Sequence, residues 1–488
     1  MTLERISYNN EPIIAPPISV DTLYDQNRNE LNDIPQTTLI PEKENQPNMP
    51  GIFNPSVEGF PAIWIPGKAV PPRFIFVEKA DDGGVGGHVE ASMRLKATIL
   101  DHVLRYNRWK NNNPIFTSLM ATHTGDDVAI TGIIDESVME HQEVVAELMW
   151  DAFKKGEKVA LEQGLYGPGQ DLKVDAFTCN THGMGPAIAI LPLPARGEKD
   201  KPSQVVVVAY ADKTEPGVYN HITTRSYLDP NFNTGLLIAD SKMNRGYIFE
   251  ITDLNTKARA YEEGIPHGDQ KVLDETMNRL GKTERTIQLS APEDYYNICR
   301  LTMDGSRYVV SKIFTKEDNG KPGQLGVVVS AERLHNIPSK DGKFSYGGKD
   351  DPVMVSLAQG DWPAPGEITS PMSLTPVVAG DCRGSHNLNI FPMPINGPTS
   401  YFSGPIMSIL SMSVNIHSGK IGAVSDQFAR GTPWDKFRDD AARKAKEFRD
   451  SQGFRQPGTL PTDEMEYQSG YVKHIKALSS RFQIRDVK

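Results

Sequence analysis

Apolar runs of strand length recur along the chain, and they restrict its fold more than any other feature. We predict strands at 74–77, 115–121, 128–134, 187–191, 205–211, 235–239, 247–251, 308–314 and 325–330. Residues 143–163 instead repeat apolar side chains at helical spacing, with Lys and Glu between them, and shorter helices are expected at 90–106, 292–301 and 434–451. Many strands with a few long helices predict an α/β fold in which helices cover sheets in layers.

Residues 1–70 differ in composition from the rest of the chain. They are rich in Pro, Asn, Glu and Asp and show weak periodicity. Such a segment could wrap a neighbouring subunit or stay partly disordered. A short apolar stretch at 62–66 could form an isolated strand, so the boundary between this segment and the following domain is not sharply defined. We therefore expect an N-terminal extension over 1–70 and one large domain over 71–488.

The charge and cysteine content exclude several classes of protein. The 488 residues include 62 acidic and 52 basic side chains, a formal net charge of -10, which disfavours a nucleic-acid-binding face. Cys179, Cys299 and Cys382 lie far apart, so we expect a reducing compartment and no disulfide framework. The polar N-terminus lacks the apolar core of a signal peptide, and the longest apolar runs are too short to span a bilayer. We expect a cytoplasmic protein without a membrane or nucleic-acid partner.

Acidic side chains gather in four turns at the ends of predicted strands. These turns carry Asp81 with His88 seven residues later, Asp126 with Asp127, Asp212 before Lys213, and Asp350 with Asp351. Neighbouring carboxylates repel, and the repulsion becomes severe in a cleft of low dielectric constant. A divalent cation removes it, and magnesium prefers oxygen ligands and can hold a phosphate and activate water. The pattern predicts a magnesium site suited to phosphoryl transfer.

Each turn alone also has an ordinary interpretation. An Asp-Asp pair is most often solvated turn chemistry, and His88 alone would more often be structural. The loop at 83–87 lacks the Lys-Ser/Thr ending of a phosphate-binding P-loop. Gly125-Asp126-Asp127 between two strands is similar to a polymerase palm hairpin, but the acidic net charge argues against that function. The metal hypothesis depends on four such turns in one chain and on longer motifs.

Several longer motifs carry a family resemblance. They are Tyr166-Gly167-Pro168-Gly169-Gln170-Asp171 with Gly183-Met184-Gly185-Pro186, Ala211-Asp212-Lys213-Thr214-Glu215-Pro216-Gly217, Asp229-Pro230 with Phe232-Asn233-Thr234-Gly235-Leu236, Gly348-Lys349-Asp350-Asp351-Pro352-Val353-Met354, Arg383-Gly384-Ser385-His386, and Glu464-Met465-Glu466-Tyr467. In this order they resemble the signatures of the fructose-1,6-bisphosphate aldolase/phosphatase family of archaea and some bacteria. The resemblance covers about residues 73–475. It implies one large domain built as a four-layer α-β-β-α sandwich, and a homo-oligomer, typically an octamer.

The resemblance also implies which residues bind metal and substrate. Matched positions give a site for several Mg²⁺ ions at Asp81, His88, Asp126, Asp127, Gln170, Asp212, Asp350, Asp351 and Gln359. Contacts to a small sugar-phosphate substrate fall on His88, Tyr166, Cys179, Asn180, Lys213, Arg383, Ser403 and Tyr467. Arg and Lys are the expected phosphate partners. A phosphatase activity would use Asp81 as the base for a water that attacks the 1-phosphate.

An aldolase activity would depend on Lys349. Its amine can form a Schiff base with the ketone of dihydroxyacetone phosphate, and the protonated imine accepts electrons when the neighbouring carbon loses a proton. Tyr346 matches the family's acid/base tyrosine. Asp350 and Asp351 favour the charged ammonium form of Lys349, an effect that bound magnesium would offset. Without the family match, an ion-pair lysine would be the commoner interpretation.

Two parts of the substrate pocket depart from the family pattern. The chain reads Thr178-Cys179-Asn180-Thr181-His182 where the family has Ser-Gly-Asn and a later Arg, and Ser403 stands where the family has a substrate-contacting Asp. We expect a bifunctional enzyme of carbohydrate metabolism, in gluconeogenesis, that condenses dihydroxyacetone phosphate with glyceraldehyde 3-phosphate and removes the 1-phosphate. One alternative is a repurposed aldolase or phosphatase with a different substrate. Another is a non-catalytic sugar-phosphate-binding scaffold.

Overall fold

The computed structural model describes most of the chain from residue 63 onward. The described residues are 63–64, 73–172, 185–194, 203–214, 216–230, 246–265, 268–305, 307–330, 351–374, 378–379, 388–397, 406–432, 435–436, 439–440, 443–444, 447 and 468–486. The strand predicted at 235–239 and most of the predicted extension lie outside these residues.

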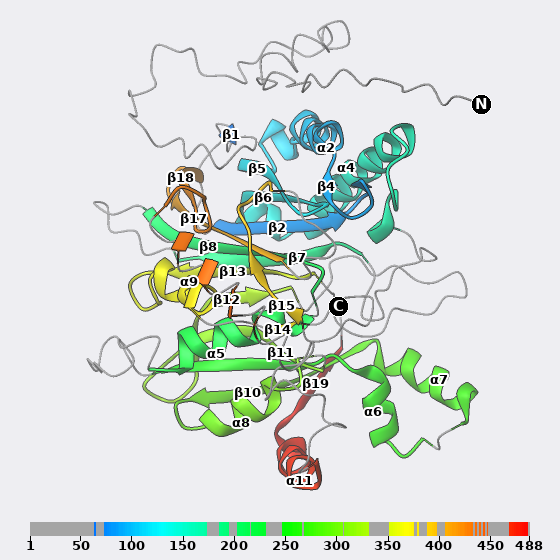
Figure 1. Cartoon of the computed structure of the whole chain (residues 1–488), viewed down its shortest axis with the longest axis vertical. Coiled ribbons are helices and arrows are strands. Elements are labelled where there is room, and N and C mark those ends of the chain that lie inside the picture. Colours follow the sequence, from blue (N-terminus) through cyan, green and yellow to red (C-terminus); the bar gives the residue numbers. More distant parts are fainter. Residues whose placement is uncertain are drawn as a thin grey trace, which may run out of the picture. The chain divides into compact units, whose positions relative to one another are not determined.

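A five-stranded antiparallel sheet has the order β1-β5-β6-β2-β7 (Figure 1). Its strands are β1 (Ile63–Trp64), β2 (Arg73–Asp81), β5 (Phe116–Thr124), β6 (Asp127–Asp135) and β7 (Ala187–Leu193). These strands confirm the predictions at 74–77, 115–121, 128–134 and 187–191. β1 falls inside the predicted extension, where it pairs with Leu119 and Ser118 of β5 instead of standing alone.

Two long helices cover one face of this sheet. α2 (Met93–Tyr106) begins after Ser92, whose side chain accepts a hydrogen bond from the backbone of Leu95, and α4 spans Gln142–Glu162. Apolar side chains of both helices share one core with Phe76 and Ile130 of the sheet. The helix predicted at 143–163 is confirmed. The one predicted at 90–106 begins later, because a short hairpin of β3 (Gly84–Val85) and β4 (Glu90–Ala91) precedes it.

A ten-stranded mixed sheet contains most of the other strands. Its order is β16-β17-β8-β13-β12-β11-β9-β10-β19, with β18 beside β17, and the β16–β17 pair is parallel. The bounds are β8 (Ser203–Asp212), β9 (Tyr247–Asp253), β10 (Thr283–Ala291), β11 (Tyr308–Lys316), β12 (Pro322–Val329), β13 (Val353–Ala358), β16 (Phe391–Pro392), β17 (Ile406–Asn415), β18 (Lys420–Asp426) and β19 (Gln483–Asp486). A separate two-stranded sheet pairs β14 (Val378–Ala379) with β15 (Leu388–Asn389). β8, β9, β11 and β12 confirm the predictions at 205–211, 247–251, 308–314 and 325–330.

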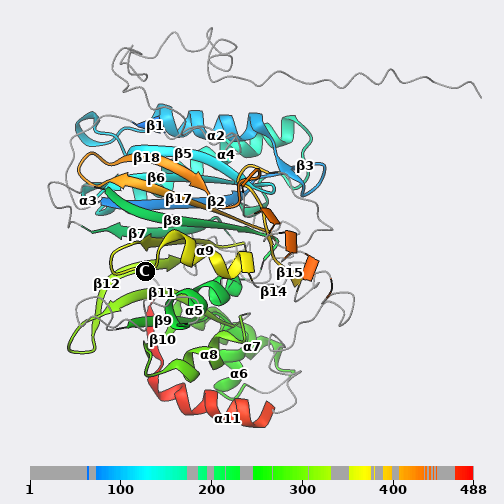
Figure 2. The same ribbon diagram turned by 60° about the vertical axis from the view of Figure 1, so that its left-hand side comes forward.

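The two large sheets pack face to face (Figure 2). Ile75 and Val77 of β2 share one core with residues 206–211 of β8. Thr131 of β6 and the hydroxyl of Tyr210 on β8 lie 2.8 Å apart in a hydrogen bond between the sheets. Because side chains alternate along a strand, the last odd-numbered residues of β2 face the same interface. Strand-end polar residues therefore meet between the sheets.

Further helices pack on the ten-stranded sheet. α5 (Asn220–Leu228) contacts α8 (Tyr295–Thr302) and α9 (Pro365–Leu374), and α8 contacts β10 and β11. Ile222, Ile298 and Ile368 of these helices belong to the core that the two sheets share. α6 (Thr256–Glu262) and α7 (Gln270–Leu280) enclose a small core of their own, and α11 spans Gln468–Leu478. α8 confirms the helix predicted at 292–301, and the described residues between 435 and 447 are helical.

The sheets and their helices make up a single α/β domain with a mixed sheet. Within the described part of the chain, no helix has both the length and the apolar character needed to cross a membrane.

Candidate metal centre

Four carboxylates meet at the edge where the two sheets face each other. Asp81 ends β2 and lies directly opposite Asp127, which begins β6. Asp126 occupies the turn between β5 and β6, and Asp212 ends β8 in the other sheet. All four are buried, and Asp126 and Asp212 are fully so. Three of the acidic turns predicted from the sequence therefore come together in space.

The first group of possible metal ligands is Asp81, His88 and Asp126, whose ligand atoms lie within 4.8 Å of one another. His88 Nδ1 is 2.9 Å from Asp126 Oδ2 and 3.7 Å from Asp81 Oδ2. The β3–β4 hairpin brings His88 back to the strand end, and Gly84 makes this turn possible. A Cβ atom on Gly84 would lie 2.2 Å from the carbonyl oxygen of Gly87 and 2.5 Å from Asp126 Oδ2. The glycine-rich loop is thus required by the tight packing around Asp126.

The second group is Asp126, Asp127 and Asp212, again with ligand atoms within 4.8 Å of one another. Two buried lysines neutralise part of its charge. Lys213 Nζ donates to Asp126 Oδ1 at 2.6 Å and to Asp212 Oδ1 at 2.7 Å, and Lys79 donates to Asp127. Lys79 was not predicted from the sequence, although its spacing of two from the last residue of β2 places it on the same strand face.

Burial and mutual repulsion shift the pKa values of these carboxyl groups. Burial is the main cause that raises the pKa of Asp81 and of Asp212, and neighbouring carboxylates raise both further. Burial also raises the pKa of Asp127 to about 6. Burial alone would raise the pKa of Asp126 too, but a buried ammonium group and the His88 hydrogen bond hold it below its ordinary value. The cluster therefore holds negative charge that its surroundings disfavour.

A divalent cation fits this set of donors. Oδ2 of Asp212 is buried and has no hydrogen-bond partner among the described residues. An unpaired buried oxygen of a charged group is costly, and a cation would satisfy it. Hard divalent cations prefer carboxylate oxygens of the kind that both groups offer. The two groups could therefore hold divalent metal ions.

Asp351 lies next to the same cluster, just before β13. Its Oδ1 accepts a hydrogen bond from the backbone N–H of Thr214 at 2.5 Å, and its own N–H donates to the Thr214 carbonyl at 3.1 Å. Asp351 also raises the pKa of Asp127, after the larger effects of burial and of a lysine that lowers it. Both Asp351 and Lys213 have positive φ angles, +48° and +62°, which non-glycine residues rarely adopt. Such strain is often found at functional sites.

The turn after α4 also reaches the centre. Asp171 Oδ2 accepts a hydrogen bond from the backbone N–H of Asp81 at 2.9 Å, a role that was not predicted from the sequence although Asp171 lies inside a quoted motif. Gln170 begins the short helix η3 (Gln170–Leu172), and its side-chain oxygen lies against the glycine three residues earlier. The half-exposed ring of Tyr166 meets the ring of His88 edge-on at 4.8 Å. Tyr166 is accessible to a substrate that binds beside His88.

Gln359 lies apart from the centre. It follows β13, whereas Asp351 precedes that strand, and six residues of strand span about 20 Å. Its neighbour Ala358 pairs with Val205, at the end of β8 opposite Asp212. Within one chain Gln359 is therefore not placed to share an ion with this cluster, and the expectation that it does so finds no support in its position.

The remaining predicted site residues lie outside the described residues. They are Cys179, Asn180, Tyr346, Lys349, Asp350, Arg383, Ser403 and Tyr467. Their roles stay predictions.

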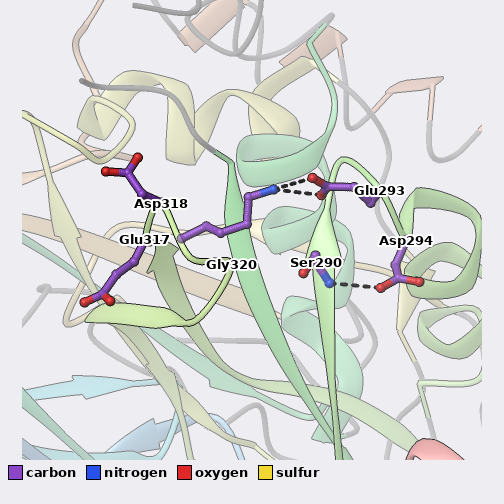
Figure 3. A pocket seen from close by; sticks show the side chains of 7 residues that line it. Ser290, Glu293, Asp294, Glu317, Asp318 and Gly320 are labelled. Carbon is purple, nitrogen blue, oxygen red and sulfur yellow. Dashed lines mark hydrogen bonds and ion pairs between the residues drawn. The ribbon is translucent and has the colours of Figure 1, made fainter. Parts of the chain in front are cut away.

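A surface pocket of about 420 Å³ is a separate feature, at β10, β11 and the turn after β11 (Figure 3). Its carboxylates include Glu293, which accepts hydrogen bonds from Lys316 at 2.6 and 2.8 Å. Asp294 accepts two hydrogen bonds of 2.8 Å from Arg481. These carboxylates already have cationic partners, and no residue of the metal centre lines the pocket.

The fold and the centre define an α/β protein with a carboxylate site for divalent cations between two sheets. Residues 74–483 match the family model described as fructose-1,6-bisphosphatase. A protein of Thermus thermophilus named fructose-1,6-bisphosphate aldolase/phosphatase is 35% identical over 409 residues, which are 83% of this chain and 98% of the relative. Proteins of the same name from Ignicoccus hospitalis and Methanothermobacter marburgensis are each 33% identical over 413 residues, 84% of this chain and 92% and 99% of the relatives. The chain belongs to the fructose-1,6-bisphosphate aldolase/phosphatase family, as its motifs predicted.

Proposed function

We propose that this chain is a magnesium-dependent, bifunctional fructose-1,6-bisphosphate aldolase/phosphatase. It condenses dihydroxyacetone phosphate with glyceraldehyde 3-phosphate through a Schiff base, and it hydrolyses the 1-phosphate of the product. The observation that carries the proposal is the meeting of Asp81, Asp126, Asp127 and Asp212 from two sheets, with the ligand atoms of each group within 4.8 Å. The names of the relatives, which state both activities, support it.

The phosphatase reaction depends on Asp81. Bound Mg²⁺ supplies positive charge that favours ionised carboxylates, neutralises phosphate oxygens and makes water more acidic. Asp81 accepts a proton from the attacking water. The water oxygen then bonds to phosphorus, the bond between phosphorus and the sugar oxygen breaks, and that oxygen takes up a proton from solvent to leave as a hydroxyl group. His88 lies 3.7 Å from Asp81 and helps to orient that carboxylate.

Substrate binding is assigned to residues around the centre. Lys213 and Arg383 bind phosphate oxygens, since both side chains carry the positive charge that phosphate attracts. The sugar and its second phosphate contact His88, Tyr166, Cys179, Asn180, Ser403 and Tyr467. The half-exposed ring of Tyr166, which lies against His88, supports this assignment.

The aldolase reaction depends on Lys349. Its neutral amine attacks the ketone carbon, the resulting hydroxyl group takes up a proton and leaves as water, and a protonated imine remains. Tyr346 removes a proton from the carbon next to the imine. That carbon then attacks the aldehyde. Asp350 and Asp351 stabilise the ammonium form of Lys349, so occupancy of the metal centre favours the neutral amine.

The wider assembly is also part of the proposal. A four-layer α-β-β-α sandwich is the proposed architecture, and the helix layer of α2 and α4, the two facing sheets and the helices on the ten-stranded sheet support it. We propose a catalytic domain over 71–488 and an N-terminal extension over 1–70. Several Mg²⁺ ions bind to the domain, with Gln170 and Asp350 among their ligands. The chain forms a homo-oligomer, such as an octamer, in the cytoplasm.

A second candidate function keeps the chemistry and changes the substrate. Ser403 and Cys179 stand where the family has different residues, and both positions contact substrate in the family pattern. A repurposed aldolase or phosphatase would retain the metal centre and Lys349 but prefer another sugar phosphate.

The proposal is tested by giving the protein Mg²⁺, dihydroxyacetone phosphate and glyceraldehyde 3-phosphate and measuring fructose 6-phosphate and free phosphate. Both products should form, and both should disappear with excess chelator. Asp126→Asn should abolish both, whereas Asp318→Asn, an exposed residue away from the centre, should not. Full turnover in chelator with no metal retained would contradict the metal requirement. Absence of both products with native protein would favour the second candidate.

A further inference from the structure

We propose that Asn396, His123 and Lys96 form a bracket that positions the Asp126–Asp127 turn against Asp212 of the other sheet. The inference rests on the proposed metal function, because it concerns how well the second group of carboxylates can share a cation. None of the three side chains belongs to the metal or substrate sites described above. We treat them as positioning residues.

The bracket begins at an edge of β5 that no strand covers among the described residues. β6 pairs with β5 along one edge, while β1 pairs with the other edge only at Leu119 and Ser118. Further along, Asn396 takes the place of a strand. Its backbone N–H donates to the carbonyl of His123 at 2.8 Å, and its side-chain Oδ1 accepts from the N–H of His123 at 2.9 Å. One residue thus satisfies both backbone groups of His123, three residues before Asp126.

The conformation of Asn396 suits this double contact. Its φ angle is +58°, in the left-handed region that asparagine tolerates better than most residues. The backbone and the side chain of one residue can then both turn toward the same strand edge. A residue without a side-chain acceptor would satisfy only half of this contact.

Lys96 of α2 closes the bracket from the helix layer. Its Nζ lies 3.2 Å from Asn396 Oδ1 and 2.9 Å from His123 Nδ1, and the side chain is fully buried. Burial is the main cause that lowers the pKa of Lys96, to about 7, and lowers that of His123 to about 3. His123 is therefore neutral at physiological pH. Burying these polar groups is costly, so their directed hydrogen bonds specify one arrangement.

The segment before Asn396 is fixed to the other sheet. Met393 donates from its N–H to the carbonyl of Met407 on β17 at 2.9 Å, and the Ser408 hydroxyl donates to the Pro394 carbonyl at 3.3 Å. β17 pairs with β8, and its first residue, Ile406, is the partner of Asp212. A short chain of hydrogen bonds thus leads from the strand that ends in Asp212 to the residue that precedes the Asp126 turn.

This chain of hydrogen bonds lies at the edge where the spacing between the carboxylates of the two sheets decides whether they can share a cation. Asp126 and Asp127 belong to one sheet and Asp212 to the other, so the spacing of their oxygens depends on how the sheets sit at this edge. Hydrogen bonds are directional, so this link restricts how the two sheets can shift relative to each other at this edge. Groups that hydrogen-bond directly to a metal ligand typically contribute about tenfold to hundredfold in metal affinity, and the bracket acts one step further away, through His123, so we expect the lower end of that range.

The test measures Mn²⁺ binding by electron paramagnetic resonance and calorimetry, with thermal unfolding recorded for each variant. Asn396→Gly tolerates the positive φ angle and keeps the backbone N–H but removes the acceptor. It should weaken Mn²⁺ binding at the second group, Asp126, Asp127 and Asp212, about tenfold. Asn396→Asp keeps an acceptor for both contacts and should restore binding. Asn112→Gly, at an exposed asparagine with φ +61°, is the matched control and should bind as the native chain does.

Lys96→Met serves as a second variant in case Asn396→Gly folds poorly. It removes a buried amine, so it should not lower the melting temperature at pH 7, yet it should weaken the same Mn²⁺ site roughly tenfold. If the native chain binds no Mn²⁺, the proposed metal function and the bracket both fail. If the native chain binds Mn²⁺ and both variants bind it equally well, the bracket alone is wrong.

Discussion

Lys79 forms an ion pair with Asp127, the residue that lies directly opposite Asp81 across the β2–β6 pair. Lys79 and Asp127 are almost fully buried, so the pair neutralises Asp127, whereas no lysine of the described residues forms an ion pair with the facing Asp81. The two carboxylates at this strand end therefore differ in charge compensation, because Asp127 has a lysine partner among the described residues and Asp81 does not. Asp81 remains the one suited to accept a proton.

Lys79→Met should destabilise the chain in the presence of a chelator by roughly 3–5 kcal/mol, because it leaves a buried carboxylate without its cation. Excess Mg²⁺ should recover part of this loss, since the metal supplies the missing charge. Chemical denaturation in chelator and in Mg²⁺ measures both values. Lys312→Met is the control, because Lys312 pairs with buried Glu250 away from the centre and its cost should not depend on Mg²⁺. An equal cost for Lys79→Met in both conditions would contradict the prediction.

Substitutions at three carboxylates should separate the two groups of ligands. Asp81→Asn should weaken Mn²⁺ binding at the first group, Asp212→Asn at the second, and Asp126→Asn at both, because Asp126 belongs to each. Each substitution should lower the Mn²⁺ affinity by at least the tenfold to hundredfold expected for removing a group that hydrogen-bonds to a metal ligand. A Mn²⁺ titration followed by electron paramagnetic resonance measures the affinity and the number of ions. If Asp81→Asn and Asp212→Asn abolish the same single site, the two groups are one.

Strand positions and acidic turns could be predicted because both leave local patterns. The apolar run before Asp212 and the turn at Asp126 are each visible within about ten residues of sequence. The meeting of these turns was predictable only as a hypothesis from charge repulsion and motif order. Short strands such as β16, and β17 with its polar serines, carry weaker patterns, and neither was predicted.

Contacts between distant segments left no local signal. Asn396 lies 273 residues from His123, and nothing near Asn396 in the sequence indicates that it completes the edge of β5. Lys96 occupies one position of an otherwise ordinary amphipathic helix, where a lysine is most often solvated. The position of Gln359 depends on the length and direction of β13, which motif order alone does not reveal.

The buried amine of Lys96 predicts a pH dependence of stability. Burial, opposed by Glu90, lowers its pKa to about 7, against an ordinary value near 10.5 in the unfolded chain. Between these values the unfolded chain binds more protons, so this group makes the free energy of unfolding rise with pH. The slope for one proton is about 1.4 kcal/mol per pH unit. Denaturation of the native chain and of Lys96→Met from pH 6.5 to 9 should show this slope in the difference between them. A constant difference would mean that Lys96 is not neutral in the folded protein.

Lys349 should form a covalent imine with the ketone substrate. Borohydride reduction in the presence of dihydroxyacetone phosphate and Mg²⁺ should then leave a mass adduct on the peptide that contains Lys349. Lys349→Arg keeps the positive charge but cannot form the imine, so aldolase activity should vanish while phosphatase activity survives in part. An adduct on another lysine, or no adduct, counts against the assignment.

Ser403 should change the substrate preference of the enzyme. A carboxylate at this position could accept hydrogen bonds from sugar hydroxyls, whereas serine is shorter and neutral and both donates and accepts. Losing a hydrogen bond to a charged group costs about 1.5–3 kcal/mol, which is roughly a tenfold to hundredfold loss in kcat/KM for fructose 1,6-bisphosphate. Ser403→Asp should recover that loss, and Ser418→Asp, on the turn between β17 and β18, is a control that should not. Efficient turnover of fructose 1,6-bisphosphate by the native chain, with no gain in Ser403→Asp, would show that the pocket has kept its ordinary substrate.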